Sequence, residues 1–144
     1  RAAAQGALAA REQARRRSLH GPRQDTLLTL AELGLALVDQ DEVALRAVFA
    51  RVHDLDDKIL RDLATRWLGQ TARFWPLPWF ERVLQLWRAE VDFKPSYFGI
   101  AWAAVLNKAP DHALAAGRLG AERYADDEAF VAEFAFMKRL LGKQ

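Results

Sequence analysis

The sequence predicts an all-α protein, either a compact multi-helix bundle or a short helical-repeat-like stack of seven to eight helices. Apolar residues recur at intervals of three and four along almost the whole chain, which is the period of an amphipathic helix. No segment alternates apolar and polar residues over the length of a strand, and no Asn-Gly or Asp-Gly pair marks a hairpin. A chain of 144 residues is long enough for one domain with a substantial core.

The helices follow one another along the chain with short breaks. Residues 1–17 are rich in alanine and arginine and favour an exposed or frayed helix, which Gly21-Pro22 ends. The next helix has little polar surface and should be central to the core. Each later helix carries an apolar side opposite a charged one. The predicted ranges are 26–38, 42–52, 54–70, 78–87 and 95–106, with two further helices that begin at Asp111 and at Asp126 or Asp127.

Caps and prolines set the predicted boundaries. Side-chain oxygens at four helix starts can accept hydrogen bonds from the first free N–H groups. These residues are Asp41, Asp54, Asp111 and either Asp126 or Asp127. The segment Trp75-Pro76-Leu77-Pro78-Trp79 stops a helix, because each proline pushes the preceding residue out of helical space. Pro95 is expected at the first helical position, where Phe93 and Phe98 would form a hydrophobic staple.

The apolar stripes also predict which large side chains are buried. Trp67, Trp87 and Trp102 fall on these stripes, and so do Leu63 and Leu106. The helix from Asp111 is poor in large side chains, and its glycines would let a neighbouring helix approach closely. These glycines are Gly117 and Gly120.

An internal similarity at an offset of 15 residues is the reason for the stack alternative. Leucines, valines and acidic residues of the 30–42 segment are matched in the 45–57 segment, and Leu60, Leu63 and Trp67 continue the pattern. This period is short for two-helix repeats, which run roughly 33–47 residues. Three successive amphipathic helices of equal length with aspartate caps explain the similarity better.

Charge is distributed unevenly along the chain. Residues 1–23 hold six basic residues and one acid, whereas residues 24–144 hold fifteen basic residues and eighteen acids. We therefore divide the chain into a basic arm or linker, 1–23, and an all-α domain, 24–144. Clustered arginines neutralise phosphates, so the arm predicts contact with nucleic acid or another polyanion. The residues expected to bind are Arg11, Arg15, Arg16, Arg17 and Arg23.

The residues that commonly carry catalysis or bind metals are sparse. The chain has no cysteine, which excludes disulfides and thiolate sites and fits a cytoplasmic location. His20, His53 and His112 are scattered, and no phosphate-binding loop or nucleophile elbow is present. The acidic clusters are better explained as helix caps than as calcium loops. We expect no enzyme activity, no cofactor and no metal, and no apolar run approaches the length of a membrane span.

The sequence thus predicts a non-catalytic helical binding module with a DNA-binding or similar role. The chain begins at Arg1 rather than Met, so we expect a fragment or processed product of a longer protein. Its body would pack against the rest of that protein or against a partner. The alternative is a protein–protein adaptor with no nucleic-acid role, in which Trp75 and Trp79 form an aromatic patch for the partner. A small-ligand pocket near His53 or His112 stays open as a third hypothesis. We assign the sequence to no family.

Overall fold

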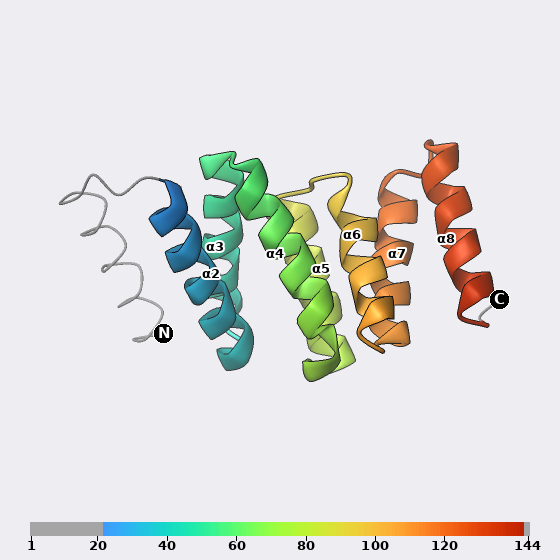
Figure 1. The fold of residues 1–144 in the computed structure, drawn as a ribbon, viewed down its shortest axis with the longest axis horizontal. Coiled ribbons are helices and arrows are strands. Elements are labelled where there is room, and N and C mark those ends of the chain that lie inside the picture. Colours follow the sequence, from blue (N-terminus) through green and yellow to red (C-terminus); the bar gives the residue numbers. More distant parts are fainter. Residues whose placement is uncertain (1–21, 143–144) are drawn as a thin grey trace. The chain divides into compact units, whose positions relative to one another are not determined.

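The computed structural model describes residues 22–142, and within this range the chain forms seven α-helices and one 3-10 turn, with no β-strand (Figure 1). The predicted all-α class is therefore confirmed. None of the helices in the described range is both long and apolar enough to cross a membrane. The elements are α2 (Pro22–Asp39), α3 (Glu42–Leu55), α4 (Lys58–Thr71), η1 (Ala72–Phe74), α5 (Leu77–Glu90), α6 (Ser96–Leu106), α7 (Pro110–Arg123) and α8 (Glu128–Leu140).

The chain divides into two compact units, with the border between Leu60 and Arg61. In the first unit, α2 and α3 pack against each other and Thr26 donates a hydrogen bond to Asp57 over 3.4 Å. Apolar side chains from both helices are buried there because they recur on one face of each helix. They are Leu33, Ala36, Leu37, Leu45, Val48, Phe49 and Val52. The predicted domain start after Arg23 adjoins residues that the structure does not describe, and it stays a prediction.

In the second unit, α6 packs on α7 and α7 packs on α8, and alternate helices also contact one another. α4 meets α6 where a Cβ built on Gly69 would lie 2.5 Å from the carbonyl oxygen of Ile100. α5 packs on α7, and α6 packs on α8 through the rings of Phe98 and Phe130, whose centroids are 5.0 Å apart. Figure 1 shows α4, α6 and α8 in the nearer layer and α5 and α7 behind them. Within this unit the helices thus form a two-layered stack.

The predicted glycine contacts are present. A Cβ on Gly120 would lie 2.7 Å from the Cβ of Tyr97 on α6, and one on Gly117 would lie 3.0 Å from Phe134 on α8. Both distances are shorter than ordinary van der Waals contact, so α7 approaches its two neighbours because these positions lack side chains.

Two of the predicted caps are confirmed and two are wrong. Asp41 accepts a hydrogen bond from the N–H of Ala44, and Asp127 accepts from two N–H groups at the start of α8. By contrast, α3 continues through Asp54 to Leu55, because its apolar stripe extends to Val52 and beyond. The next helix begins at Lys58, where Asp57 accepts from Ile59. Asp111 lies inside the first turn of α7, whose cap position is Ala109 without a side-chain bond.

Smaller differences concern a proline and the burial of the stripes. Pro95 occupies the cap position of α6 rather than its first helical position. Trp87 is fully buried as predicted, whereas Trp67 and Trp102 are half-buried. Leu63 is exposed, and Leu106 is 82% exposed, although Ala104 and Ala109 on either side of it are buried. An apolar stripe predicts a face, but only the neighbours decide how much of that face is covered.

Candidate functional site

Four polar side chains converge on the segment between α5 and α6. Asp92 has a left-handed backbone with φ 47°, and its N–H donates to the carbonyl of Trp87 over 2.9 Å. Tyr97 donates its hydroxyl hydrogen to Asp92 Oδ1 over 2.7 Å, and Tyr124 donates to the same oxygen over 3.3 Å. Arg123 donates from Nε and Nη2 to Oδ2 over 3.0 and 2.7 Å. These residues form the Asp92 cluster, which ties the start of α6 to the end of α7.

The electrostatics of the cluster favour one protonation state. Partial burial acts to raise the pKa of Asp92. The hydrogen bonds from Tyr97 and Arg123 and the positive charge of Arg123 have a larger effect, so the pKa lies below its ordinary value. Burial and the hydrogen bond to Asp92 raise the pKa of Tyr97 well above its ordinary value. Burial and the charge of Asp92 also raise the pKa of Tyr124. At neutral pH the carboxylate is therefore ionised and both phenols keep their protons.

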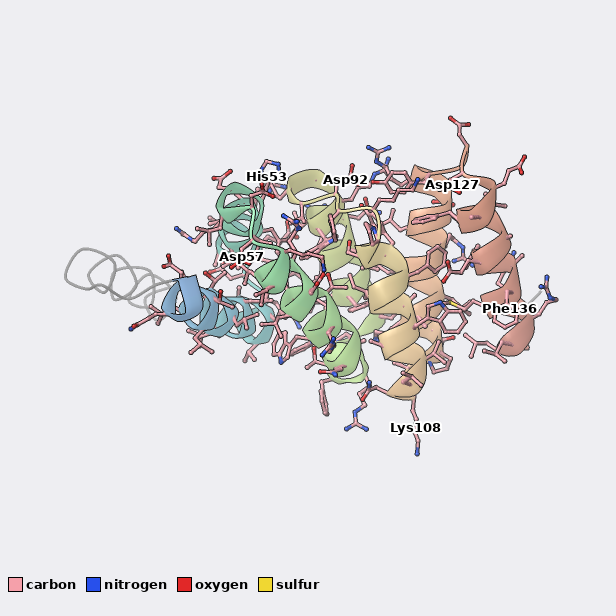
Figure 2. All side chains as sticks on the ribbon, turned by 45° about the horizontal axis from the view of Figure 1, so that its top comes forward. His53, Asp57, Asp92, Lys108, Asp127 and Phe136 are labelled. Carbon is pink, nitrogen blue, oxygen red and sulfur yellow. The ribbon has the colours of Figure 1, made fainter. Side chains whose placement is uncertain are left out.

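A second ion pair lies beside the cluster. Lys94 Nζ is 2.6 Å from Asp127 Oδ2, and the same ammonium lies 5.0 and 5.2 Å from the ring centroids of Tyr124 and Phe130. The hydrogen bond from Lys94 lowers the pKa of Asp127. Desolvation partly offsets this effect, and the N–H bonds from α8 lower the pKa further. Figure 2 shows Asp92 and Asp127 at the same end of the second unit, with Lys108 at the opposite end.

Lys94, Asp127, Arg123 and Tyr124 border an open hollow of about 640 Å³. The two cations that line it, Lys94 and Arg123, already form ion pairs with Asp127 and Asp92. The exposed acids Asp126 and Glu128 add further negative charge. The hollow is therefore net acidic and would attract cationic rather than anionic groups. Its lining residues are Lys94, Arg123, Tyr124, Ala125, Asp126, Asp127, Glu128 and Ala129.

The Asp92 cluster is better suited to stabilising the fold than to transferring protons. Both oxygens of Asp92 accept hydrogen bonds and its pKa is lowered, so it is a poor general base at neutral pH. Tyr97 keeps its proton and donates it to Asp92. Among residues 22–142, no group of histidines and carboxylates is placed to hold a metal ion.

The predicted nucleic-acid contacts cannot be placed relative to this hollow. Arg11, Arg15, Arg16 and Arg17 lie outside the described residues, and so does the side chain of Arg23. Their assignment to phosphate binding stays a prediction.

The aromatic corner after α4 is only partly accessible. Trp79 is 8% exposed in the first turn of α5, and its Nε1 has no hydrogen-bond partner in the described part of the chain. Trp75 is half-buried and donates from Nε1 to the hydroxyl of Thr71 over 3.1 Å. Phe74 beside it is exposed. Trp75 and Phe74 are therefore the part of this corner that a partner could reach, and the predicted aromatic patch stays a prediction.

Neither of the described histidines is bonded to Asp92. His112 donates from Nε2 to the carbonyl of Trp75 over 2.7 Å, and its ring lies 5.0 Å from that of Phe80. His53 is exposed in the last turn of α3, with its Nδ1 3.4 Å from Asp54. Neither histidine lines the hollow beside the Asp92 cluster, so the third hypothesis gains no support at these positions.

Sequence reasoning missed the Asp92 cluster. One signal could have indicated it: the chain has only two tyrosines, Tyr97 and Tyr124, and both hydroxyls meet Asp92. A buried tyrosine usually finds a hydrogen-bond partner, but the sequence does not say which residue supplies it.

Comparison of the chain with protein-family models, with curated proteins and with solved structures found no match.

Proposed function

We propose that this protein is a non-catalytic helical binding module of a larger protein, which holds nucleic acid or another polyanion through the arginine-rich arm, residues 1–23. The observation that carries the proposal is the charge distribution: six basic residues and one acid in the arm, against a body with three more acids than basic residues. Arginines contribute to phosphate binding through charge and through forked hydrogen bonds. The lack of cysteine fits such a module in the reducing cytoplasm.

The described body supports this division of roles. At the hollow, Lys94 and Arg123 are paired with Asp127 and Asp92, and Asp126 and Glu128 are exposed. A phosphate would meet net negative charge there, so the hollow is unsuited to a polyanion. The arm remains the segment with the highest density of positive charge.

The test is fluorescence anisotropy of labelled DNA and RNA at increasing salt. We expect binding that weakens steeply with salt, since each neutralised phosphate of duplex DNA contributes about 0.9 to the slope of log K against log salt. Replacing Arg11, Arg15, Arg16 and Arg17 by alanine should weaken binding and flatten this slope. Heparin as a competitor reports whether another polyanion serves equally well.

The matched control removes the same charge from the body, by alanine at Arg66, Arg73, Arg88 and Arg118, which are exposed. If this variant loses as much affinity as the arm variant, only net charge matters and the arm is not the binding segment. Absence of binding at low salt would also contradict the proposal.

A second function, a protein–protein adaptor, is favoured by exposed apolar side chains on α6 and α8. Leu106, Phe136 and Leu140 are three of the exposed large apolar residues of the described chain. An adaptor would bind its partner regardless of the four arm arginines and would show no salt-dependent binding of DNA or RNA.

A further inference from the structure

Four apolar side chains on neighbouring turns of α6 and α8 make up a set that we call the α6/α8 strip. The rings of Trp102 and Phe136 lie 6.0 Å apart between centroids. Leu106 follows Trp102 by one helical turn, and Leu140 follows Phe136 by one turn. Because α6 and α8 run in the same direction (Figure 1), the two leucines extend the aromatic pair toward the same end of the unit.

Three of the four side chains of the strip are at least half exposed to solvent. Leu106 is 82% exposed, Leu140 58% and Phe136 50%. Exposed single apolar residues are ordinary, but neighbouring ones that form a patch mark interaction sites. The indole of Trp102 is also fixed in place, since its Nε1 donates to Glu133 Oε2 over 2.7 Å. A rigid aromatic side chain loses little conformational entropy when a partner covers it.

Charges beside the strip indicate what could cover it. Lys108 follows α6 and Arg139 lies in the last turn of α8, both exposed. Figure 2 shows Lys108 at the end of the unit toward which Phe136 lies. Glu133 keeps its negative charge while it accepts from the neutral indole of Trp102, but it lies one turn before Phe136, at the other end of the strip from the two leucines, and Asp111 lies in the first turn of α7, at the positive end of that helix. The surroundings of the strip therefore favour acidic groups on the partner.

We propose that the α6/α8 strip binds an acidic amphipathic helix of a partner protein, whose apolar side chains cover Phe136, Leu106 and Leu140 and whose carboxylates meet Lys108 and Arg139. Such a helix presents apolar residues at intervals of three and four, which suits an apolar strip along two parallel helices. This inference concerns the body alone and does not rest on nucleic-acid binding by the arm.

The experiment uses a fluorescein-labelled synthetic helix with leucines on one face and glutamates on the other, titrated with the full chain. A second peptide carries lysines in place of the glutamates. We expect saturable binding of the acidic peptide and at least tenfold weaker binding of the basic one. Phe136→Ser with Leu140→Ser should weaken binding at least tenfold. The matched control is Val131→Ser, an exposed apolar residue elsewhere on α8, which should leave binding unchanged.

Charge reversal keeps the test valid if the serine variant fails to fold. Lys108→Glu with Arg139→Glu should reverse the preference toward the basic peptide. The proposal is overturned by absence of saturable binding, by equal binding of both peptides, or by an equal loss in Val131→Ser. It is also overturned if sedimentation shows a dimer that the Phe136→Ser change dissociates, because the strip would then be occupied by a second copy of the chain.

Discussion

Arg123 donates two hydrogen bonds to one carboxylate oxygen of Asp92, although the residues are 31 positions apart. The planar guanidinium holds its N–H donors in a fixed geometry. Its hydrogen bonds to a carboxylate therefore fix the orientation of the two groups, in addition to the attraction between their charges. The pair joins the segment before α6 to the end of α7, and Tyr97 and Tyr124 complete the carboxylate's contacts. The stability of the second unit should therefore depend on Asp92.

Replacing Asp92 by asparagine should destabilise the protein by roughly 1–3 kcal/mol, because the amide loses the charge that Arg123 and Tyr97 meet. Urea denaturation followed by circular dichroism measures the change. Asp126→Asn removes the same charge from an exposed neighbour of the hollow and should cost far less. Equal losses in the two variants would show that the Asp92 cluster contributes nothing specific.

The contribution of Asp92 should disappear in acid. Its pKa is lowered in the folded state from the ordinary value of 3.8, so the unfolded chain takes up a proton first as the pH falls. The stabilisation is fully present above that ordinary value and is lost as the pH falls through the lowered folded value. The difference in Tm between the wild type and Asp92→Asn should therefore be constant near neutrality and shrink as the pH falls below 3.8. A difference that stays constant down to pH 2 would contradict this assignment.

The close approach of α4 and α6 predicts that Gly69 does not tolerate a side chain. The added methyl group of Gly69→Ala would meet the carbonyl oxygen of Ile100 and the Cβ of Ala103, each at 2.5 Å. Because a backbone atom cannot move aside alone, we expect a loss of about 1–3 kcal/mol despite alanine's higher helix propensity. Thermal melting measures it. Gln70→Ala, at the exposed next position, serves as the control and should have little effect.

The two tryptophans of the proline-rich corner should differ in their contribution to stability. Trp79 is buried, so Trp79→Ala leaves a cavity and should cost about 3–5 kcal/mol. Trp75 is half-buried, and Trp75→Ala should cost clearly less. Denaturant unfolding of both variants tests this order. A larger loss for Trp75 would mean that the corner is held by its exposed part, and it would weaken the case for a partner surface there.

Local features were predicted best. Asp41 and Asp127 cap their helices as expected, because capping depends on N–H groups two or three residues away. Asp54 was wrongly expected to start a helix, because a capping residue is also tolerated in a last turn when the apolar stripe runs past it. The predictions for Arg11, Arg15, Arg16, Arg17 and Arg23 stay untested, since they concern charge density in residues whose side chains the structure does not describe.

The all-α class, the succession of amphipathic helices and the uneven charge follow from the sequence alone, because periodicity and composition act over a few residues. The tertiary structure alone decided that Tyr97, Arg123 and Tyr124 meet at Asp92, and that Leu106 stays exposed while Trp87 is covered. These outcomes depend on which helices become neighbours, and that choice is made by packing between residues far apart in the chain.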